Sequence, residues 1–218
     1  MTDYSILRQR MIEKYIIDRG IRDKRVIQAI YDVPRHLFLD EPFRTKAYGN
    51  YSLPIGDEQT LTQPYMVAYM TELIQPGESD RILEIGTGSG YHTTILALLA
   101  GQIFSIERIP ALAEKAKRII DQLNIRNVSI KVFDGSLGWR EMAPFNSILV
   151  TAATPWIPEP LVEQLAPMGR MVIPVGSEKD QRLRFIMKDE DGIVAEKDVG
   201  PCRFVKLQGK YGWNNDQG

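Results

Sequence analysis

The sequence predicts an α/β fold with a mostly parallel sheet, an antiparallel edge and an N-terminal helical extension. From residue 81 onward, short apolar segments alternate with helical patterns, which is typical of a parallel sheet covered by helices. Near the C-terminus, two strand-like segments flank the turn residues Asp189-Glu190-Asp191-Gly192, a hairpin signal. Before residue 31, apolar residues recur at helical spacing.

Two helices are predicted at the N-terminus. Apolar residues recur at helical spacing between residues 3 and 19, and Gly20 is a suitable place for this helix to stop. Asp23 is expected to cap a second helix that runs through Tyr31. This helix should end before Pro34, because proline restricts the residue that precedes it.

Residues 34–64 interleave prolines and glycines with polar and aromatic residues, which predicts an ordered loop with short turns. Structureless segments of this length are usually functional. Pro64 is a suitable first residue for a third helix, which should end before Pro76-Gly77. We therefore divide the chain into residues 1–76, with helices and an active-site loop, and residues 77–218, with the sheet. The two parts are expected to form a single compact unit.

The sheet region is assigned element by element from its apolar pattern. Parallel strands are predicted at 81–85, 102–106, 128–133, 146–151 and 170–175. Intervening helices are predicted at 91–100, 110–123 and 158–166. Antiparallel edge strands are predicted at 182–188, 193–198 and 202–208.

The composition is that of an ordinary soluble globular protein, with 218 residues of which 44% are hydrophobic. The chain carries 27 basic and 28 acidic residues, a formal net charge of −1. Because no strong positive field is present, nucleic acid is not expected to be a partner. A monomer is the default expectation.

Few residues are available for metal binding. Cys202 is the one cysteine, and His36 and His92 are the two histidines, so neither a disulfide framework nor a metal centre is expected. Both histidines are interpreted as structural residues rather than general bases. The N-terminal residues are charged, and no apolar run reaches membrane-spanning length, so no membrane association and a cytoplasmic location are expected.

The most informative motif is LEIGTGSGY at residues 83–91, between the first parallel strand and the following helix. Gly86, Gly88 and Gly90 allow the backbone to approach a ligand closely. The spacing is GxGxG rather than the dinucleotide-binding GxGxxG. Glu84 would repel a pyrophosphate but suits a cationic ligand, so the motif favours S-adenosylmethionine over NAD. Glycine-rich turns also occur simply to pack a helix on a sheet.

Acidic residues end the next two strands. Glu107 lies 21 residues after Gly86, where a carboxylate can accept both ribose hydroxyls of an adenosine; the alternative is a surface glutamate. Asp134 could accept from an adenine amine while Gly135 leaves room for the ring. A strand-terminating Asp-Gly turn is an equally good interpretation of that pair. Thr151-Ala152-Ala153 ends a further strand, where small residues leave space for a substrate.

Several stretches together resemble the protein-L-isoaspartate (D-aspartate) O-methyltransferase family. They cover nearly the whole chain in order. The most diagnostic lies in AYGNYSLPIGDEQTLTQPYMVAYM at 47–70, ahead of the glycine motif. The others are VPRHLFL at 33–39, LEIGTGSGYHT at 83–93, FSIER at 104–108, FDGSLGW at 133–139, APFNSILVTAA at 143–153, LAPMGRMVIPVG at 165–176 and RFVKL at 203–207.

The resemblance implies a Rossmann-like class I methyltransferase sheet with a modified order of its last strands. It also implies methyl transfer from S-adenosylmethionine to the α-carboxylate of L-isoaspartyl residues in damaged proteins, with D-aspartyl residues as a further candidate substrate. The product cofactor would be S-adenosylhomocysteine, and the methyl ester would return through a succinimide to aspartate.

The resemblance also implies roles for individual residues. The loop 59–62 would be the active-site loop, in which Thr60 and Leu61 contact the cofactor and Gln59 the substrate, with Thr62 as the catalytic hydroxyl residue. The further cofactor contacts would be Glu84, Gly86, Gly88 and Ser89 for the methionine part, Glu107 for the ribose, and Asp134 and Gly135 for the adenine. Val205 and Leu207 would help to enclose the peptide.

Thr62 departs from the family pattern, which most often has serine at this position. Threonine keeps the hydroxyl but adds a methyl group and restricts χ1. Two alternatives to protein repair therefore stay open: a related carboxyl methyltransferase for one dedicated peptide, and a cofactor-binding module without turnover.

Overall fold

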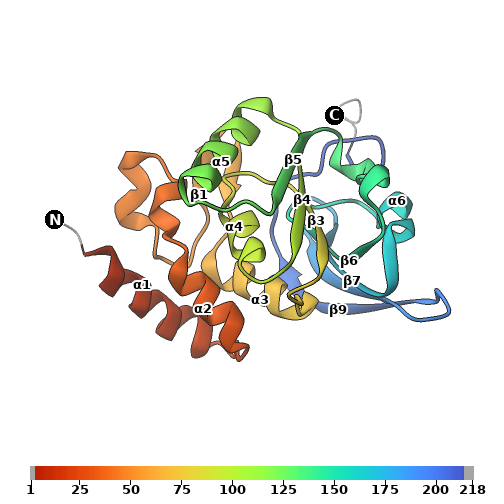
Figure 1. Cartoon of the computed structure of the whole chain (residues 1–218), viewed down its shortest axis with the longest axis horizontal. Helices are drawn as coiled ribbons and strands as arrows, with labels where there is room; N and C mark the ends of the chain where they lie inside the picture. Colours follow the sequence, from red (N-terminus) through yellow and green to blue (C-terminus); the bar gives the residue numbers. More distant parts are fainter. Residues whose placement is uncertain (1–2, 214–218) are drawn as a thin grey trace.

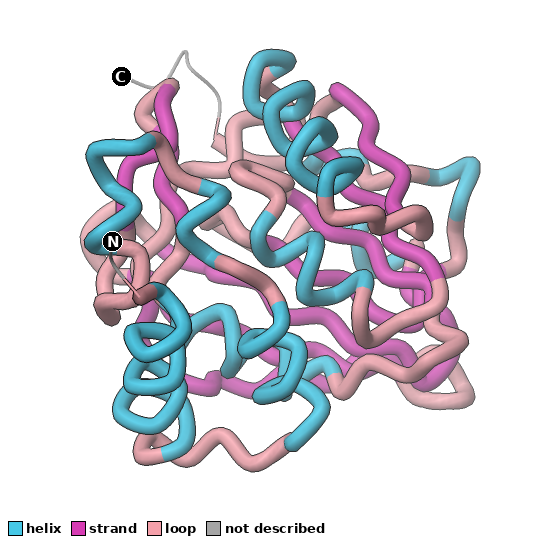
Figure 2. Tube along the Cα trace, turned by 60° about the vertical axis from the view of Figure 1, so that its left-hand side comes forward, coloured by secondary structure: helices cyan, strands magenta, loops and turns pink. Residues whose placement is uncertain are grey.

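A computed structural model describes residues 3–213 and contains a seven-stranded sheet covered by helices (Figures 1 and 2). The strand order is β5-β4-β3-β6-β7-β8-β9. The pairs among β5, β4, β3, β6 and β7 are parallel, whereas β7–β8 and β8–β9 are antiparallel. The predicted mostly parallel sheet with an antiparallel edge is confirmed.

The parallel strands lie close to their predicted positions, except that the last one begins at Leu165, within the helix predicted at 158–166. They are β3 (Arg81–Ile85), β4 (Gln102–Glu107), β5 (Val128–Val132), β6 (Phe145–Val150) and β7 (Leu165–Gly176). The edge strands β8 (Gln181–Lys188) and β9 (Val194–Cys202) form the predicted hairpin. The covering helices are α3 (Pro64–Ile74), α4 (Tyr91–Ala97), α5 (Pro110–Gln122) and α6 (Glu159–Glu163), with 3₁₀ turns η4 (Gly135–Leu137) and η5 (Arg140–Met142).

The two faces of the sheet pack against different helices (Figure 1). Leu83 and Ile85 of β3 belong to an apolar cluster that includes Leu161 of α6. Ile82 belongs to a second cluster, with residues of α3 and α4. Because side chains alternate along a strand, Glu84 also points toward α3 and α4.

The N-terminal helices form as predicted. α1 (Tyr4–Ile12) is continued by a π-helical turn, η1 (Glu13–Ile17), and Gly20 follows with a φ of 102°. α2 (Lys24–Asp32) is capped by Asp23, whose carboxylate accepts from the Arg25 N–H at 2.8 Å. One apolar cluster contains residues of α1, α2, α4 and α5, and therefore joins both sides of the boundary predicted at residue 76.

The predicted loop 34–64 contains more regular structure than expected. It forms two 3₁₀ helices, η2 (Arg35–Phe38) and η3 (Glu41–Lys46), and an antiparallel hairpin of β1 (Leu53–Gly56) and β2 (Gln59–Leu61). The turn residues Asp57 and Glu58 have φ values of 49° and 58°. Such turns usually carry Asn-Gly or Asp-Gly, so the hairpin has no strong sequence signal.

The prediction of a strand at 202–208 is wrong. β9 ends at Cys202, and the following segment forms an isolated bridge between Lys206 and Ala153. Phe204 also exchanges two hydrogen bonds with the Gln181 side chain of β8. The Ala153 N–H donates to Val205, and the Leu207 N–H donates back to Ala153. This segment therefore follows the loop after β6 instead of extending the edge of the sheet.

Within residues 3–213, no helix is long and apolar enough to cross a membrane.

Candidate active site

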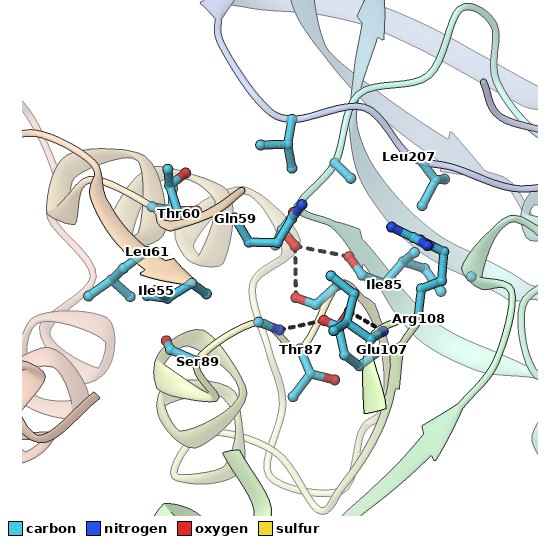
Figure 3. Close-up of a pocket in the computed structure, with 18 of the residues that line it drawn as sticks. Ile55, Gln59, Thr60, Leu61, Ile85, Thr87, Ser89, Glu107, Arg108 and Leu207 are labelled. Atoms are coloured by element: carbon cyan, nitrogen blue, oxygen red, sulfur yellow. Dashed lines mark hydrogen bonds between the residues drawn. The ribbon is translucent and has the colours of Figure 1, made fainter. Parts of the chain in front are cut away.

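A cavity of about 440 Å³ lies at the carboxyl ends of β3 and β4, between the β1–β2 hairpin and the segment after β9. Figure 3 shows residues from the hairpin, the glycine loop, the end of β4 and the C-terminal segment around one space. Ligands of open α/β sheets collect at this end of the strands. The predicted site residues on its wall are Gln59, Thr60, Leu61, Thr62, Gly86, Gly88, Ser89, Glu107, Gly135, Val205 and Leu207.

The glycine loop forms one side of the cavity. Gly86, Gly88 and Gly90 have φ values of 96°, 53° and 86°, which disfavour any side chain. A Cβ on Gly88 would lie 3.4 Å from Cδ1 of Ile55, so the hairpin packs directly on this loop. Gly135 faces the loop from η4, and a Cβ there would lie 2.5 Å from Cγ2 of Ile85. Glycine at these positions therefore allows the loop, the hairpin and η4 to pack closely around the cavity.

Glu107 is held at the end of β4 with its carboxylate on the cavity wall. Its Oε2 accepts from the Gly88 N–H at 2.8 Å, and its Oε1 accepts from the Ile109 N–H at 2.9 Å. Each carboxylate oxygen can accept more than one hydrogen bond. Glu107 can therefore bind two neighbouring hydroxyl groups while it fixes the glycine loop.

Glu84 requires a correction, because the structure does not place it on the cavity wall. Its side chain is fully buried beneath α4, where Oε2 accepts from Thr93 Oγ1 at 2.5 Å and from Ser105 Oγ at 2.6 Å. Burial raises the pKa of Glu84 to about 7, against the effect of these two hydrogen bonds. Glu84 supports the loop from below rather than contacting a ligand.

Asp134 is engaged by the backbone on both carboxylate oxygens. Its Oδ1 caps η4 by accepting from the Ser136 N–H at 2.9 Å and from Ser136 Oγ at 2.7 Å. Its Oδ2 accepts from the Lys210 N–H at 2.8 Å. The structure therefore supports the turn interpretation of Asp134, whereas Gly135 beside it lines the cavity.

Two aromatic residues that the sequence did not assign to the site form part of its wall. Tyr91 and His92 follow the glycine loop directly, which is the signal that could have identified them. His92 is hydrogen-bonded through Nε2 to Thr71 Oγ1 at 2.8 Å, and burial lowers its pKa to about 3. His92 is therefore neutral at physiological pH and is not set up as a general base. Ile55 was also missed, because it reaches the site through the hairpin.

Thr62 lies where this cavity meets a second one of about 350 Å³. Thr60, Thr62, Thr151 and Val205 line both cavities. The second cavity is completed by Ser52, Gln63, Met66, Arg203 and Phe204. The two cavities therefore adjoin at these four shared residues, one of which is Thr62.

The first cavity fits a cationic ligand that contains adenosine. Its wall offers the Glu107 carboxylate as an acceptor for ribose hydroxyls, the glycine loop, and Gly135 without a side chain. Within the described residues, no group of three or more His, Cys, Asp or Glu side chains could hold a metal ion. Fold and site together define a class I S-adenosylmethionine-dependent methyltransferase.

The particular family follows from comparison with known proteins. Residues 7–212 match the model of the protein-L-isoaspartate(D-aspartate) O-methyltransferase family, and the chain belongs to this family. A protein-L-isoaspartate O-methyltransferase of Geobacter metallireducens is 52% identical over 215 residues, which cover 99% of this chain and 100% of the relative. One of Methanospirillum hungatei is 50% identical and covers 96% of both chains.

Solved structures agree with this assignment. A protein-L-isoaspartate O-methyltransferase structure superposes with a TM-score of 0.84 at 26% identity, covering 96% of this chain and 67% of that chain. A Plasmodium falciparum protein of the same description, in complex with S-adenosyl-L-homocysteine, has the same fold, with a TM-score of 0.79 at 23% identity over 95% of this chain and 99% of that chain. Members of the family use S-adenosylmethionine as the methyl donor.

Proposed function

We propose that this chain repairs damaged proteins by methylating the α-carboxylate of L-isoaspartyl residues. The observation that carries this proposal is the meeting of two cavities at Thr62, one suited to the cofactor and one to a peptide. D-aspartyl residues remain a candidate substrate. A monomeric, cytoplasmic enzyme is part of the same proposal. The balanced charge of the sequence supports the further proposal that nucleic acid is not a partner.

In this proposal, the cofactor binds in the first cavity. Glu107 accepts the ribose hydroxyls, and Gly135 leaves room for the adenine. The remaining cofactor contacts come from Thr60, Leu61, Gly86, Gly88 and Ser89. S-adenosylmethionine supplies a methyl group that is already activated by its bond to a sulfonium. The protein therefore contributes binding and orientation rather than activation of the donor.

The peptide is proposed to enter the second cavity. Val205 lines both cavities, and Gln59 and Leu207 line the first, so these three residues are proposed to enclose the part of the peptide that reaches the junction. The Thr62 hydroxyl orients the peptide carboxylate toward the first cavity. Arg203, on the wall of the second cavity, supplies a positive charge for an acidic group. A carboxylate is already ionised at neutral pH, so no general base is required. This agrees with the neutral His92 and with the absence of an assigned nucleophile.

The product of the proposed reaction is a methyl ester on the isoaspartyl peptide. The neighbouring backbone nitrogen of the peptide can then displace methanol, which gives a succinimide that hydrolyses in part to aspartate. No residue of this chain is needed for that second stage.

The test is methyl transfer from labelled S-adenosylmethionine to two synthetic peptides that differ only in isoaspartate or aspartate. Base-labile label on the isoaspartyl peptide alone is the expected result. Thr62→Val serves as the matched variant, because it keeps the side-chain shape and removes the hydroxyl. Label on neither peptide, with calorimetric binding of S-adenosylhomocysteine intact, would refute the repair activity and favour a dedicated peptide or a silent binding module.

A further inference from the structure

Arg35, the first residue of η2, is completely buried although it carries a positive charge. Burial lowers its pKa to about 10, so the guanidinium stays charged at neutral pH. Among the described residues, no aspartate or glutamate forms an ion pair with it. Burying a cation without an anion is costly, and an apolar residue of similar size would fill the space at less cost.

The guanidinium instead joins three segments of the chain. Its Nε donates to the Ala47 carbonyl at 2.8 Å, and its Nη2 donates to the Thr62 carbonyl at 2.7 Å. Its central carbon lies 4.8 Å from the centre of the Tyr91 ring, at the start of α4. Nη1 and the Tyr91 hydroxyl have no hydrogen-bond partner within residues 3–213.

These contacts bear directly on the site, because Thr62 and Tyr91 both line the first cavity. A hydrogen bond to the Thr62 carbonyl fixes the plane of the peptide bond that follows Thr62. Hydrogen bonds from a charged donor are stronger than neutral ones, and a buried position strengthens them further. The contact therefore restricts the end of the hairpin relative to α4, and with it the direction of the Thr62 side chain.

We propose that Arg35 is a positioning residue for methyl transfer, which holds Thr62 at the junction of the two cavities. The inference rests on the proposed role of Thr62. Arg35 touches neither cavity and acts through the backbone of the active-site loop. Its contribution should therefore appear in the alignment of the reacting groups and not in the affinity for the cofactor.

Arg35→Lys and Arg35→Met test this role, with Asn127→Ala as the matched control. Asn127 also donates from one side chain to two carbonyls, those of Ala97 at 2.9 Å and Ala100 at 3.0 Å, but it lies outside both cavities. The measurements are kcat and KM with the isoaspartyl peptide, calorimetric affinity for S-adenosylhomocysteine, thermal unfolding, and amide hydrogen exchange over residues 59–63.

Arg35→Met should lower kcat roughly 10- to 100-fold, because small misplacements of reacting groups have effects of that size. S-adenosylhomocysteine affinity should change by less than about threefold, and Arg35→Lys should recover part of kcat. Hydrogen exchange over 59–63 should become faster in Arg35→Met and stay unchanged in Asn127→Ala. In the double variant Arg35→Met/Thr62→Val, the kcat loss should be smaller than the product of the two single losses.

A kcat loss no larger than that of Asn127→Ala would overturn the inference, and so would independent effects of Arg35→Met and Thr62→Val. If both Arg35 variants fail to fold while Asn127→Ala folds, Arg35 is a folding residue and the inference is also refuted. An inactive wild-type chain would refute the proposed function alone, since hydrogen exchange over 59–63 still reports whether Arg35 holds the loop.

Discussion

Because of Glu84, the free energy of unfolding is expected to fall as the pH rises toward neutral. Its carboxyl is fully buried, and Oε1 has no hydrogen-bond partner within the described residues. Burial raises its pKa from the ordinary 4.5 to about 7. The folded state therefore holds the Glu84 proton more tightly than the unfolded state does.

The difference in the pKa of Glu84 between the folded and unfolded states sets the sign and size of this pH dependence. Below pH 4.5 both states are protonated, and the favourable contribution of the neutral carboxyl is fully present. Between pH 4.5 and about 7 the unfolded chain loses this proton first, so the free energy of unfolding falls as pH rises. A pKa shift of one unit corresponds to about 1.4 kcal/mol, so the shift from 4.5 to about 7 lowers the free energy of unfolding by roughly 3 kcal/mol in total.

His92 changes stability in the opposite direction over part of this range. Its pKa falls from 6.5 to about 3, so its contribution is present above pH 6.5 and is lost as pH falls toward 3. The two residues therefore oppose each other between pH 4.5 and 6.5, and the wild-type curve alone does not separate them. Glu84→Gln isolates Glu84, because an amide stays neutral at every pH and mimics the protonated carboxyl.

Urea unfolding of the wild type and Glu84→Gln, from pH 4 to 8, measures this contribution. The difference in free energy of unfolding should move in favour of Glu84→Gln by roughly 3 kcal/mol between pH 4.5 and 7.5. Curves that stay parallel over this range would show that Glu84 ionises normally and that the reasoning from burial is wrong.

Further predictions concern the cavity walls. Glu107→Gln should weaken S-adenosylhomocysteine binding by about 1–3 kcal/mol, measured by calorimetry, because a neutral amide is a poorer acceptor for two hydroxyls. Gly135→Ala should weaken the same binding, since the new Cβ would lie 2.5 Å from Cγ2 of Ile85 and force a shift at the cavity wall; unchanged affinity would exclude this wall from the site. Thr62→Val should lower kcat by about tenfold with cofactor affinity preserved, whereas Thr62→Ser should restore turnover relative to Val. Arg203→Glu should raise KM most for isoaspartyl peptides with acidic flanking residues, and an equal change for basic and acidic peptides would contradict the assigned charge recognition.

The sequence predicts the sheet well, and it also predicts several residues that line the first cavity, because the signals are local. The predicted residues lie at or just after strand ends: the glycine loop follows β3, Glu107 ends β4, and Gly135 comes soon after β5. The carboxyl ends of these parallel strands lie at one edge of the sheet. The direction of a side chain at a strand end is less predictable. Glu84 and Asp134 are both acids near strand ends, but pleating turns the first under α4 and a local cap engages the second.

The substrate side was harder to predict, because it is assembled from segments distant in sequence. The hairpin at 53–61 has a turn without glycine, and the segment 203–207 has a strand-like pattern but follows the loop after β6. The segment 203–207 reaches Thr62 only through tertiary contacts, and the hairpin meets the glycine loop only through such contacts. Periodicity within one segment carries no information about such contacts.

The proposed cofactor contacts and the segments that hold Thr62 differ, so substitutions in them are expected to have different effects. In the proposed site, the cofactor contacts the loops that follow β3 and β4 together with Thr60 and Leu61, whereas Thr62 is held through η2. The two parts contact each other closely where Ile55 packs on the glycine loop and where Arg35 lies over Tyr91. Substitutions in η2 and at Thr62 should therefore alter turnover and peptide preference while cofactor affinity stays nearly constant, whereas substitutions at Thr60 and Leu61 should also weaken cofactor binding. An added methyl group at Thr62 is a change of this kind, because it occupies the junction of the two cavities without touching the contacts of Glu107.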